Sequence, residues 1–207
     1  PLTIASIYNN YGLIYWNKNL LDKAIENFSS SLELSEKLGN LRMLANNYNN
    51  IGLIFYEQKR FQKAYGYHLK ALGHRKKIQD TYGIGASYSN LGMILSDLKK
   101  WDSSNYYHHK AIDLKKQIGD NYGLGKAYNN LGLNFQELSH YDSAIFYQDQ
   151  ALQTHLSMEN YFNASSTYLN IGIAYYSKKA SPEALAHFNK ALEIAKNYNF
   201  QCFDSFL

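Results

Sequence analysis

Asparagine side chains recur along this chain at a fixed spacing of 40 residues, and a carboxamide can both donate and accept hydrogen bonds. The main row is Asn10, Asn50, Asn90, Asn130 and Asn170, flanked by Asn9, Asn49 and Asn129. A row of carboxamides could hold the main chain of an extended peptide regardless of the side chains of that peptide. Alternatively, these asparagines form hydrogen bonds within the protein itself, and the two roles do not exclude each other.

Two further rows follow at the same spacing. One is Trp16, Tyr56, Ser96, Gln136 and Tyr176, and the other is Asn17, Glu57, Asp97, Glu137 and Ser177. The three aromatic residues are of the type that anchors partners at interfaces, although they could instead pack against a neighbouring helix. The three carboxylates would favour a basic or neutral ligand, or else form an exposed polar rim.

No arrangement of residues predicts catalysis or a metal site. His68 and His108 are equivalent residues of successive repeats, and we interpret them as core residues that replace an aromatic. His109 would point about 100° away from His108 on a helix, which does not suit chelation. There is no HExxH or CxxC spacing, and the Gly-x-Gly strings 83–85 and 123–125 do not follow strands, so we interpret them as sites of close packing. We therefore expect no enzyme activity, no metal and no cofactor.

Charge and composition narrow the classes of function further. The formal net charge is +4, and charges of both signs are mixed along most of the chain, so we expect no direct nucleic-acid partner. The basic residues at 74–77 and 115–116 occur late in predicted helices, where we interpret them as complementing the helix dipole on an outer surface.

The sequence contains few features that indicate a cellular compartment or processing. Cys202 is the single cysteine, which excludes an internal disulfide and suits a reducing compartment. There is no apolar run of membrane-spanning length and no signal peptide, so we expect a cytoplasmic chain without a membrane partner. The chain opens at Pro1 almost in register with a repeat, and we interpret it as a segment of a longer protein.

Glycine shares the 40-residue spacing, at Gly12, Gly52, Gly92, Gly132 and Gly172. A fixed register over five copies indicates one structural unit stacked five times. Within each unit, apolar residues recur every three or four positions, as Leu44, Tyr48, Ile51 and Phe55 do, which is the helical period. Each unit is therefore predicted to be an antiparallel pair of helices. The predicted pairs are 3–18/21–38, 41–58/61–78, 81–98/101–118, 121–138/141–158 and 161–178/181–197.

Capping and packing residues repeat as well. Four units follow a predicted N-cap, namely Asn40, Asp80, Asp120 and Asn160. A glycine inside a helix costs about 1 kcal/mol relative to alanine, so five of them need a packing reason. Small residues also recur in the second helices, as at Ala64 and Ala71. We therefore expect small residues to face small residues, with Tyr48, Phe55, Leu72 and their equivalents around them in one interlocking core.

The pattern Tyr48-x-Asn50-Ile51-Gly52-x-x-Phe55, followed by Ala64 and Ala71-Leu72, resembles the tetratricopeptide repeat over residues 5–197. The spacing of 40 instead of about 34 is similar to the repeats of Pins-type scaffolds, kinesin light chains and Rap-type bacterial regulators. The resemblance implies an all-α, right-handed superhelical α-solenoid of five helix-turn-helix repeats. It would form a single array over residues 1–200, with repeats at about 1–40, 41–80, 81–120, 121–160 and 161–200. Residues 201–207 would begin a further helix or a tail.

The resemblance also implies a function. In tetratricopeptide arrays the face that here carries Asn50, Leu53 and Glu57 lines a concave groove where peptides bind. The three rows would then form a peptide-binding groove, and the partner would be a basic or neutral protein or peptide. The comparable groove positions contain only Lys126 as a cation, so a binder of terminal carboxylates is not expected.

Two further hypotheses concern the wider protein. The chain could be a sensory or regulatory segment of a larger bacterial signalling protein, such as a histidine kinase, a cyclase or a transcription regulator. Exposed ends of the array could also allow self-association, because repeat arrays need polar terminal caps and none is evident here.

Overall fold

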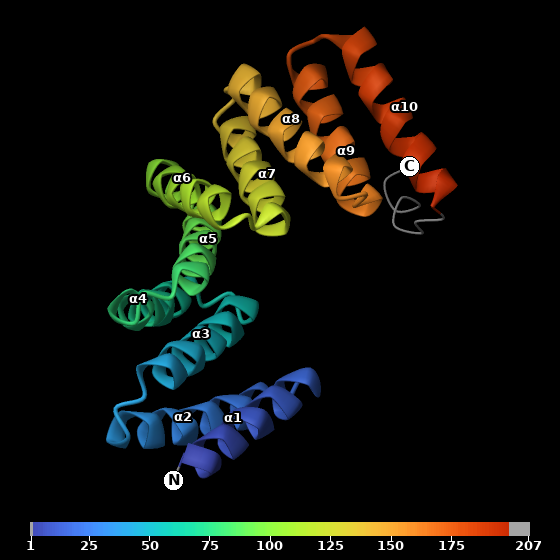
Figure 1. Cartoon of the computed structure of the whole chain (residues 1–207). Helices are drawn as coiled ribbons and strands as arrows, with labels where there is room; N and C mark the ends of the chain where they lie inside the picture. Colours follow the sequence, from blue (N-terminus) through green and yellow to red (C-terminus); the bar gives the residue numbers. More distant parts are fainter. Residues whose placement is uncertain (1, 199–207) are drawn as a thin grey trace. The chain divides into compact units, whose positions relative to one another are not determined.

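The computed structural model describes residues 2–198, which form ten α-helices and no strand (Figure 1). The first five are α1 (Leu2–Asn17), α2 (Leu21–Lys37), α3 (Leu41–Glu57), α4 (Phe61–Lys77) and α5 (Thr81–Asp97). The others are α6 (Trp101–Ile118), α7 (Asn121–Glu137), α8 (Tyr141–Ser157), α9 (Tyr161–Ser177) and α10 (Ser181–Asn197). The all-α prediction is confirmed, and the helix ends lie within about one residue of those predicted. The predicted helix or tail at 201–207 lies outside the described residues.

The chain divides into two compact units, Pro1–Lys100 and Trp101–Leu207. In the first unit, helices α1 to α5 pack mainly on their neighbours in sequence, and in the second unit α6 to α10 do the same. Such nearest-neighbour packing is that of a helical repeat solenoid. The single array over residues 1–200 stays a prediction, because α5 and α6, the two helices of its third repeat, belong to different units. No helix in the described range has the length and apolar character needed to cross a bilayer.

The predicted N-caps are confirmed at the first helices of the second to fifth repeats. In each case the side-chain Oδ1 of the cap accepts a hydrogen bond from a backbone N–H three residues later. The donors are Met43 for Asn40 (3.0 Å), Gly83 for Asp80 (3.0 Å), Gly123 for Asp120 (2.9 Å) and Asn163 for Asn160 (3.2 Å). The turn inside a hairpin contains a left-handed residue, such as Lys59 with φ 57°. There the Arg60 N–H donates to Phe55 O and the Lys59 N–H to Tyr56 O. These two bonds end α3 and reverse the chain within three residues.

The mid-helix glycines make room for large side chains of the paired second helix. A Cβ atom at Gly12 would lie 2.6 Å from the ring of Phe28, and one at Gly52 would lie 3.0 Å from the ring of His68. Gly132 meets Gln148 and Gly172 meets Phe188 in the same way. The prediction that small residues face small residues is therefore wrong for these glycines. His68 is fully buried, as expected for a residue that replaces a core aromatic.

Buried apolar side chains continue from one repeat to the next within each unit. One cluster in the first unit draws on four helices and contains Ala24, Phe28, Ile51, Ile54, Phe55, Ala64 and Ile94. A cluster in the second unit contains Ile145, Leu152, Ala164, Ile171 and Ala174. Neither cluster is confined to a single hairpin, so the interlocking core is confirmed within each unit.

The first helix is the exception to this burial. Ile4 and Ile14 are 51% and 47% exposed, whereas their equivalents Leu44 and Ile54 are 5% and 0% exposed. Tyr8, which we expected in the core by equivalence with buried Tyr48, is 36% exposed. The physical reason is that no helix among residues 2–198 precedes α1 and covers this face, whereas α2 covers the equivalent face of α3.

Candidate functional site

The asparagine rows lie on the first helices of the repeats and are hydrogen-bonded from one repeat to the next. Side-chain Nδ2–Oδ1 bonds run from Asn50 to Asn9 (3.4 Å), from Asn90 to Asn49 (3.3 Å) and from Asn170 to Asn129 (3.1 Å). The first two lie in the first unit and the third in the second. Each joins residues 41 positions apart, so the alternative of bonding within the protein holds for these six side chains.

These bonds use only part of the hydrogen-bonding capacity of the asparagine carboxamides. Each has two N–H donors and two acceptor lone pairs, and each inter-repeat bond uses one donor of one partner and one lone pair of the other. Asn10 is exposed, while Asn50, Asn90, Asn130 and Asn170 are half-buried. The rows therefore combine fixed side-chain positions with hydrogen-bonding capacity that solvent can reach.

One of these asparagines, Asn90, also contacts the buried side chain of His68. Asn90 Nδ2 lies 3.5 Å from His68 Nδ1, and His68 is fully buried. Burial, with a smaller contribution from the charge of Arg75, lowers the pKa of His68 to about 4. The ring is therefore neutral near pH 7 and can accept a hydrogen bond, which orients the Asn90 carboxamide.

The aromatic and acidic rows are joined to each other by the same register. The Trp16 Nε1–H donates to Glu57 Oε2 at 2.8 Å, across 41 residues. Tyr56 is likewise hydrogen-bonded to Asp97, and burial together with this bond raises the pKa of Tyr56. In the first unit, then, each aromatic residue orients the carboxylate of the following repeat, while Glu57 and Asp97 remain exposed.

The remaining aromatic and acidic residues of these two rows, Tyr176 and Glu137, belong to the second unit. Tyr176 is 68% exposed, and Glu137 is also exposed. Lys126 on α7 lies over the Tyr122 ring, with its Nζ 4.5 Å from the ring centroid.

A pocket of about 230 Å³ opens between α1 and α3, on the face that carries the asparagines. Its lining residues are Ser6, Asn9, Asn10, Met43, Asn46 and Asn47, five of which have polar side chains. Asn47 is 1% exposed and donates through Nδ2 to Ser31 Oγ at 2.9 Å. Its Oδ1 is buried and has no hydrogen-bond partner within the described residues. An unsatisfied buried acceptor of this kind costs free energy.

The structure adds an apolar row of which sequence reasoning named only Leu53. Five residues, one helical turn after the flanking asparagine positions, are half-buried or exposed: Leu13, Leu53, Met93, Leu133 and Ile173. Leu13 and Ile173 are 38% and 37% exposed. The spacing of four residues from Asn9 and Asn49 was the signal that could have revealed them.

Two of the basic residues that we assigned to an outer surface are instead buried. Arg75 is 7% exposed, and its Nη1 donates to Gly83 O at 3.0 Å and to Ser87 Oγ at 2.7 Å. Its position in the interior is made possible by Gly83, where a Cβ atom would lie 2.8 Å from Arg75 Cδ. The outer-surface placement is therefore wrong for Arg75, because the side chain points into the contact with the next repeat, although the residue does lie in the last turn of α4.

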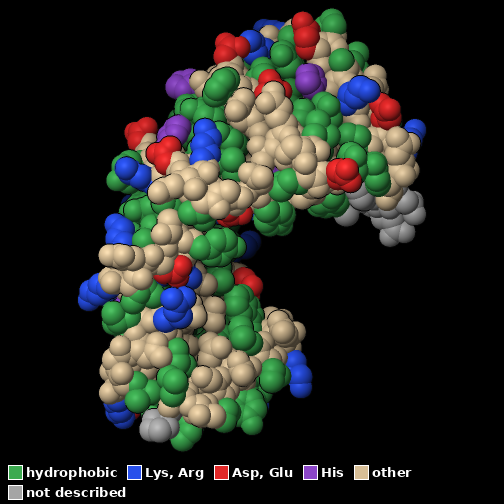
Figure 2. Space-filling view, viewed as in Figure 1, with side chains coloured by type: hydrophobic (Ala, Val, Ile, Leu, Met, Phe, Trp, Pro, Cys, Tyr) green, Lys and Arg blue, Asp and Glu red, His purple; other side chains and the backbone are tan. Residues whose placement is uncertain are grey.

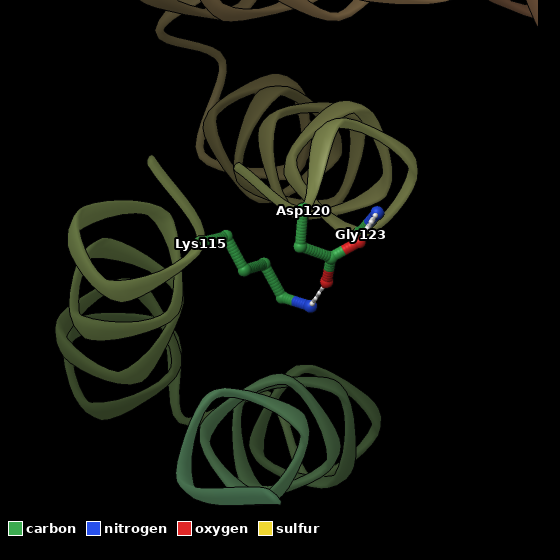
Figure 3. A network of polar contacts seen from close by, with 3 residues as sticks. All are labelled: Lys115, Asp120 and Gly123. Atoms are coloured by element: carbon green, nitrogen blue, oxygen red, sulfur yellow. Dashed lines mark hydrogen bonds and ion pairs between the residues drawn. The ribbon is translucent and has the colours of Figure 1, made fainter. Parts of the chain in front are cut away.

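Lys115 repeats this arrangement in the second unit (Figure 3). Its Nζ lies 2.8 Å from Asp120 Oδ2, and Asp120 also caps α7 through the Gly123 N–H. Burial raises the pKa of Asp120, but the bonds from Lys115 and Gly123 and the charge of Lys115 together lower it. The Gly-x-Gly strings thus give room at Gly83 and Gly123 for buried cations, which is the close packing that we expected of them.

Among residues 2–198, no group of three or more His, Cys, Asp or Glu side chains is placed to hold a metal ion.

The tetratricopeptide repeat family matches this sequence at residues 3–77, 83–157 and 165–198. No curated protein sequence matches it significantly. Among solved structures, the apo form of RapI is similar with a TM-score of 0.87 at 16% identity, over 94% of this chain and 71% of RapI. A Rap protein complexed with competence and sporulation factor is similar with a TM-score of 0.76 at 16% identity, over 95% of this chain and 55% of that one.

Repeats of a kinesin light chain from Podospora anserina are similar with a TM-score of 0.77 at 10% identity, over 94% of this chain and 95% of that one. At these identities the structural likeness shows the fold alone, whereas the family match covers most of the sequence. The tetratricopeptide fold is typically a non-catalytic scaffold. The chain therefore belongs to the tetratricopeptide repeat family and is, in general terms, a protein–protein interaction module.

Proposed function

We propose that the first-helix faces bind an extended peptide segment of a partner protein. The observation that carries this proposal is the pocket between α1 and α3, which is lined by Ser6, Met43 and four asparagines. Peptide main chain offers one N–H and one C=O per residue. Carboxamides match both groups, so the asparagine rows bind main chain with little regard to sequence.

Sequence preference would come from the two neighbouring rows. Trp16 and Tyr56 hold Glu57 and Asp97 in place before any ligand arrives, and oriented acceptors lose less entropy on binding. These carboxylates favour a basic or neutral segment. Tyr176 and Glu137 would play these parts on the first-helix face of the second unit, taken by itself. In the first unit, Leu13, Leu53 and Met93 accommodate aliphatic side chains of a ligand bound there.

A selected peptide tests this proposal. Extended peptides would be selected from a displayed library on the wild-type chain, and their affinities measured by calorimetry. Asn10→Ala combined with Asn46→Ala removes two pocket carboxamides and should weaken binding about tenfold or more, at about 1 kcal/mol per lost hydrogen bond. Asn27→Ala on α2 is the control, because Asn27 bonds to Lys23 O on its own helix. Equal affinity of the double variant and wild type would show that the ligand binds elsewhere.

A second candidate is a sensory or regulatory segment of a larger signalling protein. The likeness to RapI favours it, as does the likeness to a signal transduction ATPase with a tetratricopeptide repeat sensor from Pyrococcus horikoshii. That second match has a TM-score of 0.80 at 19% identity and covers 95% of this chain and 34% of the other. Sequencing the gene on both sides of this segment tests the idea. A kinase, cyclase or DNA-binding domain there supports it, and a gene without an output domain contradicts it.

A further inference from the structure

Helix α4 and the turn before it form a basic segment that has no counterpart in the rest of the chain. Residues 58–79 contain no Asp or Glu and seven cations, which are Lys59, Arg60, Lys63, Lys70, Arg75, Lys76 and Lys77. The whole chain has a formal charge of +4, so the remaining residues together have a charge of −3. Only Arg75 among the seven is buried. Figure 2 shows Lys and Arg side chains at the edge of the first unit where Figure 1 draws α4.

Three of these lysines form a row along the helix. Lys63, Lys70 and Lys77 are seven residues apart, so they share one face at intervals of about 10.5 Å. Within the described residues, no ion pair involves any residue of α4. Lys63 Nζ instead lies 5.5 Å from the centroid of the Phe55 ring, and Lys70 Nζ lies 5.3 Å from that of Tyr48. Lys63 and Lys70 are thus held beside aromatic rings without being neutralised.

Two glycines lie beside the lysine row, at the middle of the exposed face. Gly66 and Gly73 are also seven residues apart, and a Cβ atom at either would meet nothing within 4 Å. Glycine is a poor helix former, and no contact among residues 2–198 explains these two, in contrast to Gly12 and Gly52. A glycine on an open helix face permits another backbone to approach closely. Leu69, which lies between them in sequence, is 39% exposed.

We infer that this face of α4, defined by Lys63, Gly66, Lys70, Gly73 and Lys77, docks an acidic amphipathic helix of a partner protein. A helix lying along α4 repeats its own side chains every seven residues, at about the same 10.5 Å interval. Acidic residues at that spacing would face the three lysines, and small or apolar residues would rest on the glycines and Leu69. A nucleic-acid strand places one charge about every 3.4 Å and makes no use of the glycines.

Two peptides of equal composition serve as probes. One is a helical 21-mer, roughly three heptads long, with Glu at every seventh position and Leu on the adjoining face. The other has the same residues in scrambled order. We expect the periodic peptide to bind the wild-type chain, with an affinity that falls as salt is added, and the scrambled peptide to bind about tenfold more weakly or worse. Equal binding of the two would overturn the inference, because it would show only charge attraction.

Two variants of α4 and one control locate the site. Lys63→Gln/Lys70→Gln/Lys77→Gln removes the charge row, and Gly66→Gln/Gly73→Gln fills the open strip while improving helix propensity. Each should weaken the periodic peptide about tenfold, whereas Lys18→Gln/Lys23→Gln/Lys37→Gln, with the same charge change on the first repeat, should not. Circular dichroism checks the fold, and the glycine variant decides the matter if the lysine variant unfolds. Full affinity in the glycine variant contradicts a closely docked helix.

A single-stranded oligonucleotide is the last probe, and it tests whether this surface binds nucleic acid instead of a helix. If it binds more tightly than the periodic peptide and displaces it, the surface is a phosphate-backbone site and the inference fails. Asn10→Ala/Asn46→Ala should leave binding at α4 unchanged, so this experiment and the groove experiment fail independently.

Discussion

Trp16 on α1 donates its indole N–H to the carboxylate of Glu57 on α3 at 2.8 Å, although 41 residues separate them. The asparagine bonds between repeats and the contact of Tyr56 with Asp97 have the same offset of 41. One register between adjacent first helices therefore aligns every row of the candidate site within the first unit.

A double-mutant cycle measures this register in solution. Trp16→Phe keeps the ring but removes the donor, and Glu57→Gln removes the charge. The coupling free energy should be about 1 kcal/mol, because a bond to a charged group is stronger than average but this carboxylate is exposed. Urea unfolding followed by circular dichroism gives the four stabilities. A coupling of zero would mean that the bond does not form in solution.

The two kinds of glycine should respond oppositely to alanine. Gly12→Ala places a methyl group 2.6 Å from the Phe28 ring, and such overpacking costs about 1–3 kcal/mol. Gly66→Ala meets nothing within 4 Å and should stabilise the protein by up to about 1 kcal/mol through helix propensity. Chemical denaturation compares them. Equal effects at both sites would contradict the packing described for Gly12.

The buried pair of Lys115 and Asp120 should matter mainly when it is broken. Lys115→Met leaves a carboxylate with 15% of its side chain exposed and no cation beside it, and should destabilise the protein by about 2–4 kcal/mol. Adding Asp120→Asn removes that charge, and its side-chain oxygen can still cap α7, so the double variant should recover most of the loss. Thermal unfolding of the three proteins checks this. A double variant no more stable than Lys115→Met would contradict it.

Stability should fall in mild acid because of two buried histidines. Burial lowers the pKa of both His68 and His108 to about 4, below the ordinary value of about 6.5 in unfolded chains. Protons then bind preferentially to the unfolded state, so the stabilisation is complete above pH 6.5 and is lost as pH falls toward 4. By pH 5 the loss should reach about 2 kcal/mol for each histidine.

Another repeat of the chain suggests a substitution that tests this pH effect. Gln148 occupies the position equivalent to His68 and packs against Gly132, so His68→Gln should fold. Its unfolding free energy should vary less between pH 7 and pH 5 than that of wild type. The same change at exposed His140 is the control. An unchanged pH slope in His68→Gln would show that His68 is not buried as described.

Helices α1 and α10 should support weak association between copies of this chain. The apolar face of α1 is open at Ile4 and Ile14, and Leu185 and Leu192 on α10 are 61% and 42% exposed. Equivalents of these residues form the contacts between second and first helices inside each unit. Contact between α10 of one copy and α1 of another would therefore repeat the packing of the repeats head to tail. Sedimentation should show association that Ile14→Glu weakens, and a strict monomer at high concentration would contradict it.

The sequence by itself determined the repeat and the helices. The period of 40 and the caps Asn40, Asp80, Asp120 and Asn160 are local features. Helix periodicity and capping depend on residues only three or four positions apart, so the helix ends were predictable to within about one residue. The rows of asparagines, aromatics and carboxylates were also evident, because equal spacing puts equivalent residues on equivalent faces.

Only the tertiary structure decided what those residues contact. Two charge assignments show this: Arg75 and Lys115 read as exposed cations in sequence, yet each is buried against the next repeat because Gly83 and Gly123 leave room for it. The mid-helix glycines likewise face Phe28 and His68 instead of small residues. Such contacts join residues 8 to 41 positions apart, and they depend on side-chain volume and helix crossing. Local spacing therefore determined the helices and which residues share a helix face. Packing between the helices determined which of those side chains stay accessible to a ligand.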